Sequence, residues 1–271
     1  MNIGFTKMHG LGNDFIVIDN MNGKISLSKP QVIFLCDRHK GIGADGVILV
    51  EKSDKVDSIG SPQADCFMNY INADGSKAQM CGNGVRCVAK FLRDYVLKNK
   101  NSFLIDTRAG IKQIEHTKGN IFSVNMGKAS FFHNDFPKNP LRLGGLQLNF
   151  VSVGNPHAVA FVGDLNKYDL LTIGPQIEHD KHFPNKINFE LVKIISKAKL
   201  LVKVWERGCG ATLACGTGAC AVYVIARKYK KIKKEAIIQL PGGNLFMSEN
   251  SDGDIIMRGE ATSVFSARLS I

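Results

Sequence analysis

The sequence predicts an α+β fold made of two pseudo-symmetric lobes. Three observations lead to this prediction: a motif that occurs once in each half, more strand-like than helical segments, and helices that do not alternate regularly with strands. The irregular order favours an antiparallel-rich, β-barrel-like sheet over a doubly wound parallel sheet. We therefore expect each lobe to surround one central helix with such a sheet, and the active site to lie in the cleft between the lobes.

The repeated motif has two parts, which come in the same order in both halves. Gly12-Asn13-Asp14 precedes Cys81-Gly82-Asn83-Gly84, and Gly154-Asn155-Pro156 precedes Cys215-Gly216-Thr217-Gly218. A further cysteine and an apolar stretch follow each cysteine motif. An ordered pair of motifs is unlikely to recur by chance, so we infer two similar halves that bring both cysteine loops to a shared interface.

The secondary structure follows from local patterns. Residues 85–97 carry apolar side chains at helical spacing, and residues 219–226 are apolar on nearly every face, which predicts a buried helix. Strands are expected where β-branched and aromatic residues gather, at 15–19, 46–50, 67–72, 102–106, 121–125, 149–153, 158–162, 191–196 and 200–205.

A polar turn at residues 117–120 divides the halves. We expect an N-terminal lobe at 1–118 and a C-terminal lobe at 119–260, with a final strand at 261–271 returning to complete the first lobe.

Composition limits the class of protein. The chain has 271 residues, 44% hydrophobic and 22% charged, with a formal net charge of +11. Neither an apolar run near the roughly 18 residues of a membrane span nor a signal peptide is present in the sequence, so we expect a cytoplasmic protein without membrane contact. The basic cluster at 227–234 fits a solvated helix end, because lysines complement the helix dipole there. We expect no nucleic-acid partner, although a basic binding protein remains the alternative from a different class.

The seven cysteines point to thiol chemistry. An odd number without an export signal argues against a disulfide framework, and the lack of any Cys-x-x-Cys pair argues against a metal site. Five of them are expected to be structural thiols: Cys36, Cys66, Cys87, Cys209 and Cys220.

A cysteine at a glycine-rich helix start has a distinctive environment. Unpaired backbone N–H groups and the helix dipole attract anions and lower a thiol pKa. One copy fits a phosphate cradle or a tight turn equally well. Two copies converging on one carboxylate would stabilise a carbanion, with one thiolate removing a proton and one thiol returning it to the opposite face. Such a site predicts a racemase or epimerase that needs no cofactor.

Several motifs together resemble the diaminopimelate epimerase family. The resemblance runs from about residue 3 to the C-terminus, and proline racemases and phenazine-pathway isomerases share the two-lobed fold. The motifs that carry it are His9-Gly10-Leu11-Gly12-Asn13-Asp14-Phe15, Asn72-Ala73-Asp74-Gly75-Ser76, Cys81-Gly82-Asn83-Gly84, Gly154-Asn155-Pro156-His157, Trp205-Glu206-Arg207-Gly208 and Cys215-Gly216-Thr217-Gly218.

The resemblance implies interconversion of LL- and meso-2,6-diaminopimelate, in lysine and peptidoglycan precursor biosynthesis, without pyridoxal phosphate or metal. It assigns Cys81 and Cys215 as acid/base thiols and implies a homodimer. The substrate-binding positions that it implies are Gly82, Asn83, Gly216 and Thr217 around the reacting carboxylate, Asn13 near the reacting end, and Asn72, Asn155, Asn188, Glu206 and Arg207 largely at the distal end. His157 and Glu206 match positions that tune the cysteines.

The sequence departs from the family pattern at two positions. Gly46 stands where many members have a glutamine that contacts the reacting amine, and Phe265 stands where some have a tyrosine that supports dimerisation. A proline- or hydroxyproline-type racemase of the same fold is the closest alternative function. We also expect the two catalytic thiols to form an inactivating disulfide under oxidation.

Overall fold

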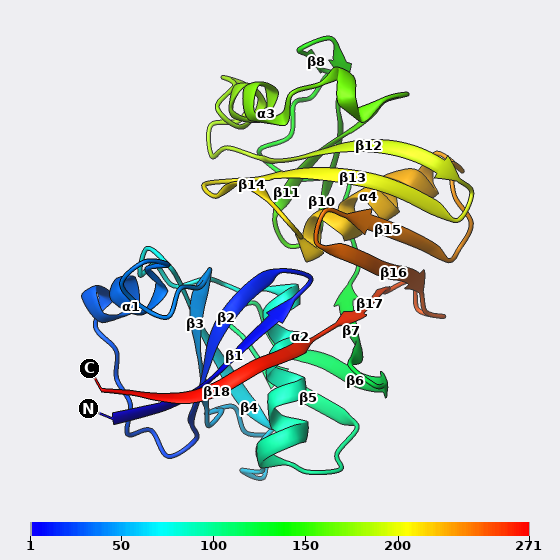
Figure 1. Ribbon diagram of the computed structural model, residues 1–271. Helices are drawn as coiled ribbons and strands as arrows, with labels where there is room; N and C mark the ends of the chain where they lie inside the picture. Colours follow the sequence, from blue (N-terminus) through cyan, green and yellow to red (C-terminus); the bar gives the residue numbers. More distant parts are fainter. Residues whose placement is uncertain (1, 271) are drawn as a thin grey trace. The chain divides into compact units, whose positions relative to one another are not determined.

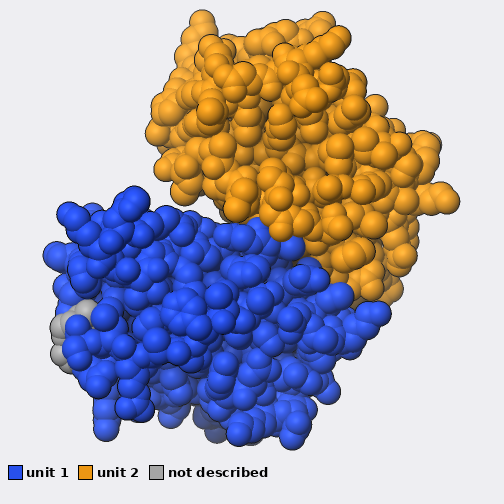
Figure 2. Space-filling model, viewed as in Figure 1, with its two compact units in different colours: residues 1–124, 259–271 blue, residues 125–258 orange. Residues whose placement is uncertain are grey.

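The computed structural model describes residues 2–270 and contains two compact units. Unit 1 comprises residues 1–124 and 259–271, and unit 2 comprises residues 125–258 (Figure 2). Within the described part of the chain, no helix is both long and apolar enough to cross a membrane.

Unit 1 combines a mixed sheet with two helices (Figure 1). The strands follow the order β7-β6-β5-β4-β3-β2-β1-β18, in which β2–β3 and β4–β5 are parallel and the other pairs are antiparallel. Its elements are β1 (Asn2–Gly10), β2 (Asn13–Asn20), α1 (Lys29–Cys36), β3 (Gly46–Glu51), β4 (Cys66–Asn72), α2 (Gly82–Phe91) with a π-helical continuation (Leu92–Val96), β5 (Ser102–Asp106), β6 (Lys112–Lys118), β7 (Ile121–Gly127) and β18 (Thr262–Ser270).

Unit 2 is built in the same way. Its sheet has the order β10-β11-β12-β13-β15-β16-β17, with β14 as an added partner of β13. Its elements are β8 (Arg142–Leu143), β9 (Leu146–Gln147), β10 (Asn149–Ser152), β11 (Pro156–Phe161), a 3-10 turn (Leu165–Lys167), α3 (Leu170–Glu178), β12 (Asn188–Ser196), β13 (Lys199–Glu206), β14 (Gly210–Thr212), α4 (Gly216–Lys228), β15 (Ala236–Leu240), β16 (Gly243–Glu249) and β17 (Ile255–Glu260).

The two units share one pairing pattern. From β1 to β7, successive strand pairs are antiparallel, parallel, antiparallel, parallel, antiparallel and antiparallel. The series from β10 to β17, passing from β13 directly to β15, repeats that pattern. In both units a helix stands between the second and third strands of the series and another precedes the fifth. The predicted α+β fold with two similar halves is confirmed.

Each sheet curves around a central helix. Helix α2 contacts β1, β2, β4, β5, β6 and β18, and α4 contacts β10, β11, β12, β15 and β16. Every residue from Gly82 to Ala89 is buried, so α2 has no solvated face over its first two turns. Small side chains make this possible, because glycine and alanine let surrounding strands approach the helix backbone closely. The start of each central helix is therefore held rigidly by the core.

The strands and central helices predicted from sequence are found, and the structure adds several elements. Helix α1 was not predicted, although Ser28 begins it with a capping box in which Gln31 Oε1 accepts from the Ser28 backbone N–H (2.9 Å). Of the predicted turn at 117–120, residues 119 and 120 form the turn between β6 and β7 and the first two residues end β6, while β18 pairs with β1 from Asn2↔Ser270 to His9↔Thr262. The ends of the described chain thus lie side by side in unit 1 (Figure 1).

Candidate active site

The first half-site is the start of α2. Cys81 is the N-cap residue, with extended backbone angles (φ −137°, ψ 120°), and its Sγ accepts from the Gly84 backbone N–H at 3.5 Å. Helix N-caps are usually serine, threonine, aspartate or asparagine, whose side-chain oxygen accepts such a bond. A cysteine in this role puts its sulfur against the positive end of the helix dipole.

The second half-site repeats this geometry at the start of α4. Cys215 is the N-cap, again extended (φ −122°, ψ 116°), and its Sγ accepts from the Gly218 N–H at 3.3 Å. The Thr217 hydroxyl lies 3.4 Å from the same sulfur. The two cysteine motifs therefore form the same local structure, which follows from their common spacing of cysteine and glycines.

Asn13 and Asn83 surround Cys81 in unit 1. The Cys81 thiol donates to Asn13 Oδ1 at 3.4 Å, and Asn83 Nδ2 donates to the same oxygen at 3.1 Å. Asn72 lies at the end of β4, where its side chain donates to Ser76 Oγ at 2.9 Å and helps to form the following turn. Of these three predicted asparagines, Asn13 thus bonds directly to the cysteine and Asn83 bonds to it through Asn13.

Asn155 and His157 lie near Cys215 in unit 2. Asn155 Nδ2 donates to Thr217 Oγ1 at 3.3 Å, and its Oδ1 is 3.0 Å from His157 Nε2. The other ring nitrogen of His157 is 2.6 Å from Glu190 Oε1, and both side chains are fully buried. Both ring nitrogens of His157 therefore have an oxygen partner, which fixes the orientation of the ring.

Three of the predicted distal-end residues, Asn188, Glu206 and Arg207, lie around the turn between β13 and β14. Asn188 Nδ2 donates to Pro156 O at 2.8 Å, and Asn188 Oδ1 accepts from the Arg207 backbone N–H at 3.0 Å. The guanidinium of Arg207 donates to Asn185 O at 3.2 Å. Glu206 Oε1 accepts from the Thr212 hydroxyl. Asn188 thus connects the Arg207 turn to β11.

A buried carboxylate outside the predicted set holds the same turn. Glu178, at the end of α3, accepts from Trp205 Nε1 at 2.7 Å and from the Gly208 N–H at 2.9 Å. Burial opposes ionisation, but these two hydrogen bonds, together with the charges of His179 and Lys186, keep the Glu178 pKa below its usual value. Gly208 has φ +79°, a left-handed conformation that favours glycine. The position of Arg207 is therefore set by contacts on both sides of it.

Burial and negative charge control Cys215. Burial raises the pKa of its thiol well above the usual value, and the carboxylates of Glu206 and Glu190 raise it further. Burial also raises the pKa of Glu206, against hydrogen bonds from Thr212 and Cys215 that lower it. In the substrate-free protein the Cys215 sulfur is accordingly protonated at neutral pH.

Gly46 has no room for a side chain. A Cβ there would lie 2.5 Å from Ile71 O and 2.5 Å from Tyr70 Cε2, with the Tyr70 hydroxyl at 3.2 Å. Gly46 pairs with Asn72 across β3 and β4, and the Tyr70 ring occupies the space beside it. The space that a side chain at position 46 would need is therefore filled by the Tyr70 ring.

The remaining cysteines and carboxylates are placed as follows. Cys36, Cys66, Cys87 and Cys220 are buried, and Cys209 is exposed at the turn after Arg207. Across residues 2–270, no three or more His, Cys, Asp or Glu side chains are grouped so as to hold a metal ion. Sequence reasoning missed Asp45, Glu178 and Glu190 as partners of site residues. Glu190 carries a weak signal, since it is a charged residue immediately before the predicted strand at 191–196.

The fold agrees with that of known proteins over nearly the full length of the chain. A structure of a Bacillus anthracis phenazine biosynthesis protein of the PhzF family matches with a TM-score of 0.73, 17% identity and coverage of 100% of both chains. A probable proline racemase from Agrobacterium radiobacter matches with a TM-score of 0.70, 14% identity and coverage of 99% of this chain and 93% of that one. This chain, with its two units of one topology, therefore has the same fold as these proteins.

Sequence similarity identifies the family within that class. The family model described as diaminopimelate epimerase matches residues 5–132 and 149–264. The diaminopimelate epimerase of Halothermothrix orenii is 41% identical over 289 residues, covering 100% of this chain and 99% of that protein. The chain belongs to the diaminopimelate epimerase family, as its motifs predicted, and is an isomerase.

Proposed function

We propose that this protein interconverts LL-2,6-diaminopimelate and meso-diaminopimelate with Cys81 and Cys215 as the two acid/base groups and without a cofactor. The observation that carries the proposal is the repeated N-cap cysteine, one at the buried helix of each unit, in a chain of this family. A reaction that inverts one carbon needs an acid and a base on opposite faces, and two equivalent thiols meet that need.

The helix starts supply the charge stabilisation. Gly82 and Asn83 at α2, and Gly216 and Thr217 at α4, would direct backbone N–H groups at the reacting carboxylate as the carbanion forms. Removing one preorganised donor from such a site typically costs about 10²–10³ in rate. Several donors from two helices therefore account for a large share of the acceleration that an amino-acid α-proton requires.

Proton transfer needs one thiolate and one thiol. The Glu206 carboxylate, which accepts a hydrogen bond from Cys215, is the acceptor through which the Cys215 proton leaves when the thiolate is required. The thiolate then takes the α-proton, and the opposite thiol delivers its own proton to the other face. His157, held between Asn155 and Glu190, lies close enough to Glu206 to lower the pKa of that carboxyl group.

The distal end of the substrate carries a second amino-acid group. Arg207 can bind its carboxylate in a bidentate manner, and Glu206 can accept from its ammonium. The amides of Asn72, Asn155 and Asn188 both donate and accept, which suits such a zwitterion. A site of this kind disfavours substrates that leave these polar groups unpaired, such as proline.

The test is proton NMR of LL-diaminopimelate with the purified protein in D2O, under reductant and without added cofactor. We expect deuterium at Cα together with meso product, both lost in Cys81→Ala and in Cys215→Ala. Exchange without inversion would mean that only one thiol is competent. No reaction with diaminopimelate but racemisation of proline or hydroxyproline would transfer the assignment to the racemase alternative.

A homodimer through β18 is part of the proposal. Strand β18 lies at the end of the strand order, and its Val264 and Phe265 side chains are 56% and 48% exposed. An exposed edge strand with apolar side chains is suited to pair with another chain. Light scattering should give twice the mass of 29.7 kDa for the wild type and the monomer mass for a Val264→Lys/Phe265→Lys variant. A wild-type monomer at micromolar concentration would rule the interface out.

The cellular environment follows from the thiols. Two reactive cysteines must remain reduced, and the cytoplasm keeps thiols reduced. We also expect no nucleic-acid partner, and two lysines of the basic cluster instead contact rings of this chain: Lys228 Nζ lies 3.8 Å from the Phe131 ring centroid and Lys231 Nζ 5.2 Å from that of Phe161. Nucleic-acid binding with a steep salt dependence would contradict this view.

A further inference from the structure

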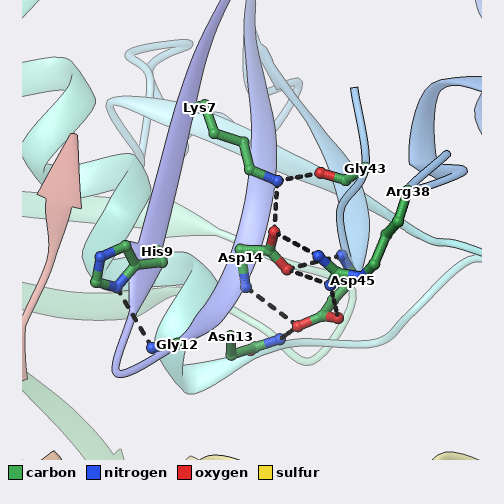
Figure 3. A network of polar contacts seen from close by, with 8 residues as sticks. All are labelled: Lys7, His9, Gly12, Asn13, Asp14, Arg38, Gly43 and Asp45. Atoms are coloured by element: carbon green, nitrogen blue, oxygen red, sulfur yellow. Dashed lines mark hydrogen bonds and ion pairs between the residues drawn. The ribbon is translucent and has the colours of Figure 1, made fainter. Parts of the chain in front are cut away.

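A directed series of side-chain hydrogen bonds in unit 1 runs from Arg86 to Asp45. Arg86 Nη2 donates to Asn83 Oδ1 at 2.8 Å, and Asn83 Nδ2 donates to Asn13 Oδ1 at 3.1 Å. Asn13 Nδ2 then donates to Asp45 Oδ2 at 2.6 Å, and Figure 3 shows this last bond of the series. We call these four residues the amide relay.

The two ends of the amide relay determine its direction. A guanidinium can only donate and an ionised carboxylate can only accept, whereas an asparagine amide can be turned end for end. Turning Asn13 would place its NH2 against the NH2 of Asn83 and its oxygen against the Asp45 carboxylate. Turning Asn83 would place its NH2 against the Arg86 guanidinium. Both amides therefore have one orientation.

The orientation of the Asn13 amide decides whether the Cys81 sulfur faces a hydrogen-bond acceptor or a donor. Asn13 Oδ1, the atom that accepts from Asn83, also accepts from the Cys81 thiol at 3.4 Å. A reversed amide would offer the sulfur a donor in place of an acceptor. An acceptor favours the protonated thiol, and a donor favours the thiolate. The amide relay therefore favours the protonated Cys81 thiol, with its S–H directed at Asn13 Oδ1.

Asp45 is itself fixed by charges that do not touch the cysteine. Its Oδ1 accepts from Arg38 Nη2 at 2.8 Å, and its Oδ2 accepts from the Asp14 backbone N–H at 3.1 Å. Arg38 also binds the Asp14 carboxylate at 2.7 Å, and Lys7 Nζ donates to Asp14 and to Gly43 O (Figure 3). Burial opposes ionisation of Asp14, but the cations Arg38 and Lys7 hold its pKa below the usual value.

We propose that Asp45 and Arg86 are positioning residues for the reaction, which act through Asn13 and Asn83 to present an acceptor oxygen to the Cys81 thiol. The proposal rests on the proposed function for its kinetic consequence. Asp45 is the residue to test, because its side chain is 41% exposed and Arg86 is completely buried. Replacing Asp45 disturbs the core far less than replacing Arg86.

The matched control is Asp65. Like Asp45, it accepts from one backbone N–H (Leu104, 2.9 Å) and pairs with one cation (Lys100), but its partners are outside the relay. We expect Asp45→Ala to lower kcat about 10- to 100-fold with KM changed less than about threefold, as for a misplaced catalytic contact. Asp45→Asn, whose amide oxygen can still accept from Asn13, should be intermediate. Asp65→Ala should retain wild-type kcat at a comparable melting temperature.

A double-mutant cycle separates positioning from general structure. If Asp45 acts through Asn13, Asp45→Ala should change kcat less than about twofold once Asn13 is already alanine, since coupled residues are non-additive. Full additivity, or an unchanged kcat in Asp45→Ala, would overturn the proposal.

A second readout does not depend on turnover. The rate at which iodoacetamide alkylates Cys81 at constant pH should rise about two- to tenfold in Asp45→Ala, since a freed Asn13 amide can donate one hydrogen bond to the thiolate. The rate in Asp65→Ala should match the wild type. If the wild type shows no epimerase activity but the Cys81 alkylation rate still rises in Asp45→Ala, the proposed function is rejected and the amide relay is retained. An unchanged alkylation rate in Asp45→Ala would reject the relay.

Discussion

At the scale of single residues, Cys215 is governed by the acidic side chains beside it. Burial raises its pKa first, and Glu206 contributes more than Glu190 among the charges that raise it further. A carboxylate beside Cys215 disfavours the thiolate, so removing the charge of Glu206 should remove part of that upward pKa shift.

We therefore expect Glu206→Gln to move the pH at half-maximal Cys215 alkylation downward. Mass spectrometry of the Cys215 peptide after brief iodoacetamide treatment across pH 7–10.5 measures this pH. Glu249→Gln, which replaces a partner of Arg227, is the control and should leave the profile unchanged. A shift to higher pH in Glu206→Gln would show that Glu206 acts on Cys215 by something other than its charge.

Gly46 is a second residue whose identity is set by its neighbours. A Cβ would meet the backbone oxygen of Ile71 at 2.5 Å, and a strand cannot yield there as a flexible side chain could. Gly46→Ala should lower the free energy of unfolding by about 1–3 kcal/mol, the usual cost of overpacking. Urea unfolding followed by circular dichroism measures the change, with Gly4→Ala, which has open space around its Cβ, as the control.

At the scale of elements, the two helix starts differ in how tightly they are enclosed. A Cβ on Gly218 would lie 2.7 Å from Glu190 Oε1, the atom that binds His157. A Cβ on Gly84 would meet the Ile48 Cδ1 methyl at 3.2 Å, which is the end of a flexible side chain. The same substitution should therefore have different effects at the two positions.

We expect Gly218→Ala to destabilise the protein by about 1–3 kcal/mol, because Glu190 must move away from His157. Gly84→Ala should change stability by no more than about 1 kcal/mol, since the helical preference for alanine offsets the mild crowding. Chemical denaturation of both variants tests the difference. Equal destabilisation would mean that the Glu190–His157 contact contributes little.

The basic cluster at the end of α4 lies where cations bond to backbone carbonyls of the chain itself. Arg227 Nη1 donates to Ile232 O at 3.3 Å, and Lys197 Nζ donates to Lys230 O at 2.8 Å. These contacts bind carbonyls just beyond the helix, where cations are favoured by the dipole. The charge run thus has a local structural use.

At the scale of the whole molecule, buried thiols link stability to alkaline pH. Burial raises the pKa of Cys36 to about 11 and that of Cys87 to about 12, from a usual 9.0, and raises those of Cys66 and Cys215 as well. Above pH 9 the unfolded chain loses these protons while the folded chain keeps them. The stabilisation present below pH 9 is therefore lost progressively as pH rises toward the folded values.

We expect the urea midpoint to fall between pH 9 and 10.5 and to be nearly flat between pH 7 and 8.5. Cys87→Ala should flatten the alkaline slope, because it removes one proton from the difference between the two states. Slopes, not absolute midpoints, are the quantity to compare, since the substitution also removes core volume. An identical slope in Cys87→Ala would assign the effect to other groups.

Local features were predictable from the sequence because their causes are local. The cysteine N-caps of α2 and α4 depend on a cysteine and glycines within four positions, and both were predicted as helix starts. The strands at Ser102–Asp106 and Ile121–Gly127 follow from β-branched and aromatic residues in a short segment. Helix α1 also has a local signal, the capping box formed by Ser28 and Gln31.

By itself, the sequence determined the duplication, the α+β class, the two capping cysteines and the family. Only the tertiary structure decided which side chains contact the residues around the two cysteines. Asp45 meets Asn13 and Glu190 meets His157 across 32 and 33 positions of sequence, because strand register brings them together. A one-residue slip in either strand would turn those side chains to the opposite face of the sheet. Contacts of this kind are a property of the packed sheet, and no short motif encodes them.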